Sequence, residues 1–180
     1  LNHDKEKILS TLKDLGYYFS KVDVFVDDLD NNKVNIQYKI DLGDKAKIRK
    51  ITFIGDKVFK DRKLRSVILS EEYKFWKFIS EKKFLNEDLI NFDNRLLTNF
   101  FLNKGYFQVK VNTSFAKIIN ENEFELIYNI NAGPKIFFDE LKLNLPIDYE
   151  KSNFLKLEKL LSKLKNKPYS INSIEKILEE

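Results

Sequence analysis

The sequence has no cysteine, no methionine and only one histidine in 180 residues. Without cysteine there is no disulfide framework and no thiolate metal site, which suits a reducing compartment, or an oxidising one in which the fold needs no cross-link. The single histidine, His3, lies beside the terminus. That argues against Ser-His-Asp and Cys-His catalysis and against metal sites built from several histidines.

Glycine and proline are scarce as well, with five and three residues. No glycine-rich phosphate-binding loop is present. Asp28, Asp30 and Asn32 have the spacing of a calcium-binding loop. Lysine, however, stands at the sixth and twelfth positions of that loop, where glycine and glutamate are needed (Lys33 and Lys39). We interpret the segment as a polar hairpin turn and predict no enzyme activity, no cofactor and no metal site.

Long apolar runs are missing too. None approaches the about 18 residues of a membrane-spanning helix, and the N-terminus lacks the pattern of a signal peptide. The chain begins at Leu1 and contains no methionine, so we interpret it as a piece excised from a longer protein. A leader or a membrane domain then has room to lie outside it.

The residues that are present favour a packed fold. Hydrophobic residues make up 43% of the chain, including 16 Phe and 8 Tyr, which is ample for a core. Charged residues make up 33% but are mixed in sign, leaving a net charge of +4. Lysine-rich solvated faces account for this balance better than a dedicated acidic partner does.

The most informative pattern is a repeat. Gly16 and Gly105 are 89 residues apart, and each follows a helical pattern and precedes an alternating strand. Gly43 and Gly133 are 90 residues apart, and each closes the hairpin that follows. Two landmarks at nearly the same interval indicate a repeated module.

Hydrophobic periodicity predicts the elements of each module. In chain order they are a helix over 2–15, a hairpin over 22–40, a strand over 47–54, a short helix after Asp61, a long aromatic connection over 70–83, a helix after Asn86, strands over 107–115 and 123–131, a strand over 141–145, and helices over 154–164 and 171–180. Asp61 and Asn86 are predicted helix N-caps. Leu89, Phe92, Leu96 and Phe100 are the predicted core face of the second helix.

The repeating unit is therefore strand–helix–helix–strand–strand, an α+β module. We divide the chain into the C-terminal part of one unit at 1–44, a complete unit at 45–132 and the N-terminal part of the next at 133–180. Each complete unit is expected to have a three-stranded mixed sheet covered on one face by its two helices. Such a sheet has two edges.

This order and three of its sequence motifs resemble the POTRA domain, the tandem periplasmic module of BamA-type outer-membrane protein assembly factors. The segment 47–56 resembles the first strand of the family and its I-x-F-x-G-N/D ending, with Asp56 at the last position. Residues 89–111 resemble the second helix, the Gly-Tyr pair and the second strand. The aromatic residues of 75–84 resemble the insertion between the helices of the third domain. The resemblance covers the end of a second, a whole third and the start of a fourth domain.

The resemblance implies a scaffold at the periplasmic face of the bacterial outer membrane rather than an enzyme. Its implied partners are unfolded β-barrel precursors, accessory lipoproteins and a membrane barrel at the C-terminal end of the same protein. POTRA arrays also occur in two-partner secretion, in TamA and in chloroplast import pores. A spacer in such a pore, without client binding, is therefore the alternative. An RNA-binding role would need aromatics on the solvent face of the sheet, where only Phe25, Ile54 and Ile127 are apolar.

Two segments are candidate binding sites. An edge strand offers unpaired backbone groups to an extended peptide, a mode known as β-augmentation. The second strand is the candidate for this role (Phe107, Gln108, Val109, Lys110, Val111, Asn112 and Thr113). Lys110 fits equally well as a charge that keeps the edge from aggregating. The second candidate is an aromatic contact patch (Tyr73, Phe75, Trp76 and Phe78), for which core or inter-module packing is the competing interpretation.

Overall fold

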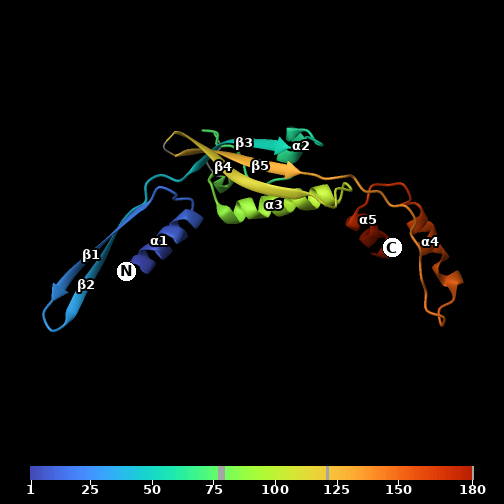
Figure 1. The fold of residues 1–180 in the computed structure, drawn as a ribbon, viewed down its shortest axis with the longest axis horizontal. Coiled ribbons are helices and arrows are strands. Elements are labelled where there is room, and N and C mark those ends of the chain that lie inside the picture. Colours follow the sequence, from blue (N-terminus) through green and yellow to red (C-terminus); the bar gives the residue numbers. More distant parts are fainter. Residues whose placement is uncertain (77–79, 121, 180) are drawn as a thin grey trace.

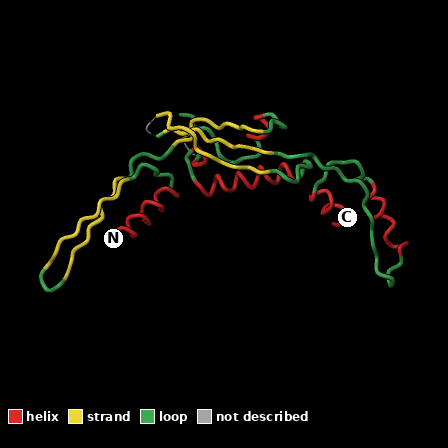
Figure 2. The backbone as a smooth tube through the Cα atoms, in the orientation of Figure 1, coloured by secondary structure: helices red, strands yellow, loops and turns green. Residues whose placement is uncertain are grey.

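The computed structural model describes residues 1–76, 80–120 and 122–179. It shows a central α+β unit with a further piece of structure at each end, and both ends bend toward the same side (Figure 1). Figure 2 shows that long loops separate the elements within the central unit and join it to the C-terminal part. No helix among the described residues is long and apolar enough to cross a membrane.

The N-terminal part consists of a helix and a two-stranded hairpin: α1 (Asn2–Asp14), β1 (Lys21–Leu29) and β2 (Lys33–Asp41). The strands pair antiparallel in continuous register from Lys21↔Asp41 to Leu29↔Lys33. Two asparagines with positive φ, Asn31 and Asn32, form the turn, a conformation that asparagine tolerates better than most residues.

The sequence predicted that this hairpin buries one face, and that prediction was wrong. Only Val22 is buried on the two strands, whereas four other apolar side chains are 43–54% exposed (Val26, Val34, Ile36 and Ile40). The physical reason is the lack of cover, because among the described residues β1 and β2 form a sheet of their own. Alternation alone does not create a second layer.

The central unit contains β3 (Lys47–Gly55), α2 (Asp61–Arg65), a 3₁₀ turn η1 (Glu81–Lys83), α3 (Glu87–Leu102), β4 (Lys110–Asn120) and β5 (Glu123–Asn131). Its strands lie in the order β3-β5-β4, with β3 parallel and β4 antiparallel to the central β5. The predicted three-stranded mixed sheet is confirmed. Its two edges are β3 and β4.

The core lies between one face of this sheet and α3, which runs along it (Figure 1). Sheet residues such as Ile51, Leu126 and Tyr128 are at most 2% exposed. On α3 the buried residues are Ile90, Asp93, Leu97 and Phe101, whereas Phe92 is 41% exposed. The predicted core face of this helix was therefore rotated by one residue. It missed the real face because that face carries a carboxylate, Asp93.

Asp93 is fully buried and ties three parts of the unit together. Its two carboxylate oxygens accept hydrogen bonds from the backbone N–H groups of Leu69 (2.6 Å) and Ser70 (3.0 Å). The Tyr128 hydroxyl also donates to it, at 2.9 Å. Burial, followed by the nearby Asp93 charge, raises the pKa of Tyr128 above its ordinary value. A buried charge of this kind is tolerated only when it is hydrogen-bonded, as here.

The two predicted helix caps had different outcomes. Asn86 caps α3 as predicted, since its side-chain oxygen accepts from the Leu89 N–H at 2.8 Å. Asp61 is instead the first residue of α2, and the extended residue Lys60 precedes it as the N-cap without a side-chain bond. An aspartate within the first turn still opposes the positive end of the helix dipole.

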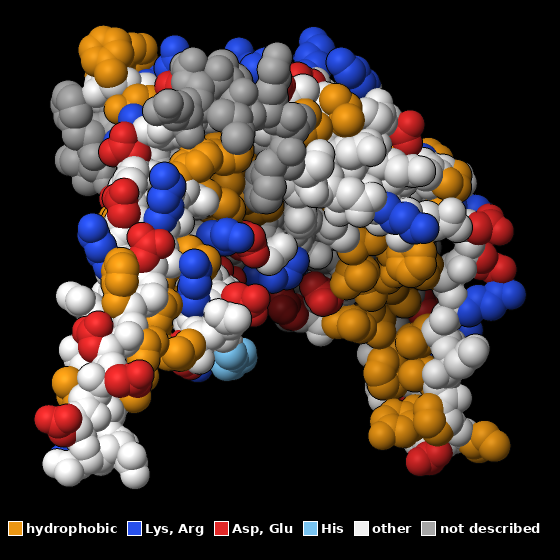
Figure 3. Space-filling model, turned by 60° about the vertical axis from the view of Figure 1, so that its left-hand side comes forward, with side chains coloured by type: hydrophobic (Ala, Val, Ile, Leu, Met, Phe, Trp, Pro, Cys, Tyr) orange, Lys and Arg blue, Asp and Glu red, His pale blue; other side chains and the backbone are white. Residues whose placement is uncertain are grey.

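The C-terminal part contains η2 (Lys151–Phe154), α4 (Leu155–Ser162) and α5 (Ile171–Glu179). The strand predicted over 141–145 is not formed, which corrects the sequence interpretation. No described strand lies beside this segment, so its backbone groups have no ladder to join. Figure 3 shows apolar side chains on the surface of this part, where Ile147, Leu155 and Leu178 are more than half exposed.

The first joint, between the N-terminal part and the central unit, is held by backbone hydrogen bonds. Gly16, at φ 92°, ends α1, and its carbonyl accepts from the Ala46 N–H at 2.9 Å. The Ala46 carbonyl in turn accepts from the Leu85 N–H at 2.8 Å. The cap residue of α3, Asn86, donates through its amide to the Asp14 carbonyl at 2.7 Å. The end of one helix thereby meets the start of the next.

Aromatic side chains reinforce the first joint. The Phe19 and Phe124 rings are stacked with centroids 5.7 Å apart, and Tyr18 lies 6.1 Å from Phe124. Burial, with the charges of Glu87 and Asp14 nearby, raises the pKa of Tyr18 to about 12. The joint is therefore a packed contact and not a free linker.

The second joint, between the central unit and the C-terminal part, repeats this arrangement. Gly105, also at φ 92°, ends α3, and its carbonyl accepts from the Ile136 N–H at 2.7 Å. The Ile136 carbonyl accepts from the Tyr169 N–H at 3.0 Å. Ser170, just before α5, donates to the Asn103 side chain at 3.1 Å. Each joint also contains one isolated β-bridge at the matching place, Lys47↔Phe84 and Phe137↔Pro168.

Candidate strand-binding edge

The candidate edge strand is indeed a sheet edge, but it begins later than predicted. The sequence predicted a strand from 107, whereas β4 starts at Lys110. The three residues before it form a turn that follows the helix end, in which the Val109 N–H donates to the Tyr106 carbonyl at 3.3 Å. A backbone that bonds to itself in a turn cannot also extend as a strand. Phe107, Gln108 and Val109 therefore precede the edge.

The residues of β4 that follow alternate as a strand with one covered face should. Lys110 and Asn112 are exposed, whereas Val109 and Val111 pack partly against the core. Thr113 is half-buried, and its hydroxyl donates to the Asn94 side chain of α3 at 2.5 Å. Among the described residues, none outside the sheet hydrogen-bonds to the backbone of 110–114. This stretch therefore offers one side of its backbone to a further strand.

Two hollows border the β4 edge. One has an empty volume of about 560 Å³ and lies between α3 and the strand, lined by Glu87, Ile90, Asn91, Asn94 and Thr113. The other, of about 830 Å³, lies at the start of the strand and is lined by Phe107, Gln108, Val109, Lys110, Asn131 and Gly133. Both are open and mostly polar. A strand added to β4 would place side chains beside them.

Phe107 connects this edge with the next unit. Its side chain is 54% exposed, and its ring lies edge-on to Tyr169 with centroids 5.7 Å apart. Tyr169 in turn contacts Phe138 at 5.2 Å. The start of the candidate site therefore lies at the second joint. A ligand there would touch residues of two units.

The other edge of the sheet, β3, is covered. The Tyr73 N–H donates to the Ile48 carbonyl at 2.6 Å, and Arg65 and Glu72 bond to the backbone of Ile51. Sequence reasoning missed both of these charged residues, because nothing in the periodicity of 60–75 distinguishes them from ordinary surface charges. The two edges of one sheet thus differ in availability.

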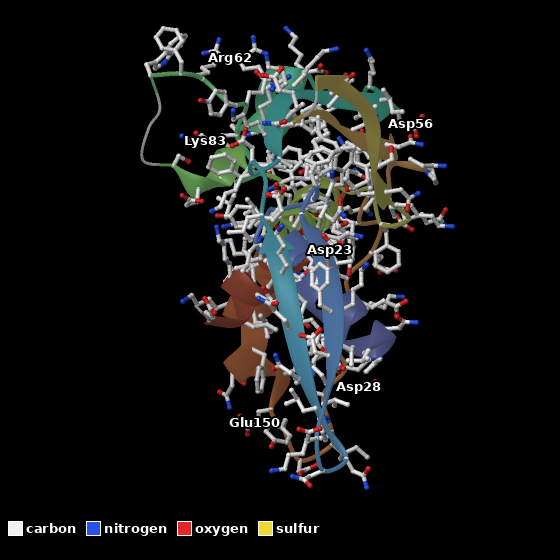
Figure 4. The ribbon with its side chains drawn as sticks, turned by 90° about the vertical axis from the view of Figure 1, so that its left-hand side faces the viewer. Asp23, Asp28, Asp56, Arg62, Lys83 and Glu150 are labelled. Carbon is white, nitrogen blue, oxygen red and sulfur yellow. The ribbon has the colours of Figure 1, made fainter. Side chains whose placement is uncertain are left out.

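The candidate aromatic patch is divided in two by the structure. Tyr73 packs near Phe84 with centroids 6.5 Å apart, and the Lys47 and Lys83 ammonium groups lie over its ring. Phe75 and Trp76 instead contact each other at 4.7 Å and are 73% and 58% exposed. Figure 4 shows this loop projecting away from the unit beyond the labelled Lys83. The fourth member, Phe78, lies outside the described residues.

No group of three or more His, Cys, Asp or Glu side chains among the described residues is placed to hold a metal ion. Asp28, from the calcium-like spacing, is a residue of β1 that pairs with Val34, and Figure 4 shows it far along the hairpin. The buried carboxylate Asp93 already has three hydrogen-bond donors. The surfaces described above therefore suit contact with macromolecules, through backbone and aromatic groups.

Comparison with known proteins places these features in a family. The POTRA family, described as a surface antigen variable number repeat, matches residues 46–133, which is the central unit. The outer membrane protein assembly factor BamA of Neisseria meningitidis is 29% identical over 152 residues, covering 84% of this chain and 19% of the relative. BamA of Buchnera aphidicola is 26% identical over 137 residues, covering 76% and 21%.

A solved structure shows the same fold. The third to fifth POTRA domains of Haemophilus influenzae BamA align with 97% of this chain and 68% of that one, with a TM-score of 0.51 and 16% identity. The chain spans about a fifth of the length of the BamA relatives. Residues 46–133 are a POTRA domain, and the chain is a POTRA segment of the BamA type.

Proposed function

We propose that this chain is part of a periplasmic scaffold for outer-membrane β-barrel assembly, where β4 receives unfolded precursors by β-augmentation. The names of its relatives, outer membrane protein assembly factors, support this role. In such a protein the segment would dock accessory lipoproteins and pass clients to a membrane barrel at the C-terminal side. The role requires binding surfaces and no catalytic group.

The observation that carries the proposal is the difference between the two sheet edges, with β4 open and β3 covered. Each backbone hydrogen bond to an added strand contributes roughly 0.5–1.5 kcal/mol net. A few such bonds give weak binding that tolerates many sequences, because the backbone is the same in every client. Weak and tolerant binding suits a scaffold that must release many different precursors.

The exposed aromatic pair is our candidate for docking an accessory subunit. Phe75 and Trp76 form a compact apolar tip with the Lys74 ammonium 5.8 Å from the Trp76 ring. Exposed tryptophan and phenylalanine are typical anchors of protein interfaces. Tyr73 is less available for this role because it packs at the base of the loop.

An amide-resolved NMR titration with an unfolded outer-membrane β-strand peptide tests the proposal. We expect shifts at 107–113 and a dissociation constant on the order of 1 mM, as expected for a few net hydrogen bonds. Lys110→Pro should weaken binding more than Lys110→Ala, because proline removes a backbone donor and alanine removes only the charge. Circular dichroism must show that both variants are folded.

The alternative, a spacer in a secretion or translocation pore, is favoured by the two joints, which fix the units with repeated hydrogen bonds. A spacer predicts no shift at millimolar peptide. Shifts restricted to 73–76 would instead move the client site to the aromatic loop. Unchanged binding in a folded Lys110→Pro variant would overturn the assignment to β4.

A further inference from the structure

The covered edge of the sheet is closed at its centre by two charged side chains, Arg65 and Glu72, which we call the Arg65–Glu72 clamp. Glu72 Oε1 accepts the Ile51 N–H at 3.0 Å, and Arg65 Nη2 donates to the Ile51 carbonyl. The two side chains also bond to each other, with Arg65 Nη1 2.6 Å from Glu72 Oε1. Both backbone groups of Ile51 are therefore occupied from outside the sheet.

This arrangement imitates a neighbouring strand. A strand that pairs with β3 would have to bond to the outward N–H and carbonyl of the same residue, which is how sheet ladders form. The clamp supplies one acceptor and one donor at those two positions. Ile51 lies in the middle of β3 (Lys47–Gly55), so a competing strand cannot pair along the edge without displacing the clamp.

The backbone on the N-terminal side of the clamp is closed as well. The Tyr73 N–H bonds to the Ile48 carbonyl at 2.6 Å, and the Leu85 N–H bonds to the Ala46 carbonyl at 2.8 Å. The two legs of the aromatic loop thus run against the first half of β3. The clamp is the closure at its centre, and it consists only of side chains, so it can be removed without rebuilding the loop.

The clamp is strong enough to matter because its hydrogen bonds involve charged groups, which are about twice as strong as neutral ones. Its side chains are 38% and 28% exposed, so solvent only partly screens them. On β4, by contrast, no described residue outside the sheet bonds to the backbone of 110–114. An extended peptide therefore meets a resisting edge and a free one on the same sheet.

We propose that the Arg65–Glu72 clamp selects the strand-accepting edge of this domain, keeping β3 closed so that clients add only at β4. This inference rests on the proposed function, since it assigns the residues that direct strand addition. Removing Glu72 takes away the acceptor for Ile51 and the partner of Arg65 at once. The domain then presents two open edges and binds two strands.

The test compares Glu72→Ala with Glu81→Ala by the same NMR titration. Glu81 belongs to the same loop and forms an ion pair with Lys45 at 3.0 Å, but it does not bond to β3, so its variant is the matched control. We expect peptide shifts at 48–54 in Glu72→Ala, in addition to those at 107–113, and only the latter in the control. Without peptide, the Ile51 amide should exchange with solvent about tenfold faster in Glu72→Ala, reflecting the loss of a charged hydrogen bond.

The outcomes separate this inference from the proposed function. Shifts at 107–113 in all proteins with none at 48–54 in Glu72→Ala would overturn the clamp and leave the β4 site standing. New shifts at 48–54 in Glu72→Ala without shifts at 107–113 in the wild type would support the clamp and refute the β4 site. If no peptide binds anywhere, the exchange rate of Ile51 decides, and an unchanged rate overturns the clamp.

Discussion

The N-terminal part and the central unit contain the same pair of residues in two different environments. Asp4 and Tyr38 stand 89 and 90 residues before Asp93 and Tyr128, and in both places the tyrosine hydroxyl donates to the aspartate. The central bond is 2.9 Å long and buried, whereas the N-terminal bond is 3.3 Å long and exposed. The repeat therefore preserves the contact while the surroundings decide how much it stabilises.

The difference shows what completes a unit. In the central unit Asp93 also accepts two N–H groups from the segment after α2, which lies over the core. In the N-terminal part Asp4 is paired instead with the ammonium group of Leu1 at 3.2 Å. A helix and a hairpin are enough to form the tyrosine–aspartate contact. The first strand and first helix are needed to bury it.

The largest contrast is expected from removing the aspartate in each place. Asp93→Ala leaves Tyr128 and two backbone N–H groups buried without their acceptor, so the central unit should lose about 3–5 kcal/mol of unfolding free energy. Asp4→Ala should leave the urea midpoint unchanged, because water replaces the carboxylate. Urea unfolding followed by circular dichroism measures both. Equal effects would show that burial does not distinguish the two pairs.

A second contrast compares the helices. Leu97 of α3 is fully buried, and Ile8 occupies the equivalent position of α1, where the side chain is only partly covered. Leu97→Ala should cost about 2–5 kcal/mol, as expected for a cavity in a packed core. Ile8→Ala should cost clearly less, because a partly exposed site gains little from burial. A similar loss in both variants, measured by the same unfolding curves, would contradict this ranking.

The smallest contrast concerns alkaline pH. The raised pKa of Tyr128 means that the unfolded chain loses this proton first as pH rises past about 10, so stability should fall above that pH. The slope is at most about 1.4 kcal/mol per pH unit for this one group. Tyr128→Phe should flatten it, whereas Tyr38→Phe should change it little. Unfolding curves between pH 9 and 11.5 test this, and an unchanged slope in Tyr128→Phe would refute it.

Sequence reasoning recovered the features that depend on local pattern. Glycine spacing and alternation predicted the repeat, the element order and the mixed sheet, and Asn86 was recognised as a cap because its role involves residues three positions away. The failures all involve partners distant in sequence. Asp93 is buried because of bonds to 69, 70 and 128, and the 141–145 segment lacks a neighbouring strand to pair with.

The same limit applies to the candidate site. The position of β4 at the edge followed from the connectivity of a three-stranded sheet, whereas its later start at Lys110 depended on the turn after Gly105. The closure of β3 by Arg65 and Glu72 was not predictable, because a charged pair seven residues apart has no periodic signal. The aromatic loop was noticed from composition, but only the structure separates packed Tyr73 from exposed Trp76.

The two joints have a geometric consequence for the chain. Because the same hydrogen bonds, from Gly16 to Ala46 and from Gly105 to Ile136, link successive units, each step applies nearly the same rotation and translation. Identical steps generate a screw, so consecutive units follow an arc of constant curvature, as the two bent ends in Figure 1 indicate. A small change of angle at one joint is then multiplied by the length of everything beyond it. The array behaves as a lever whose far end moves much further than its pivot.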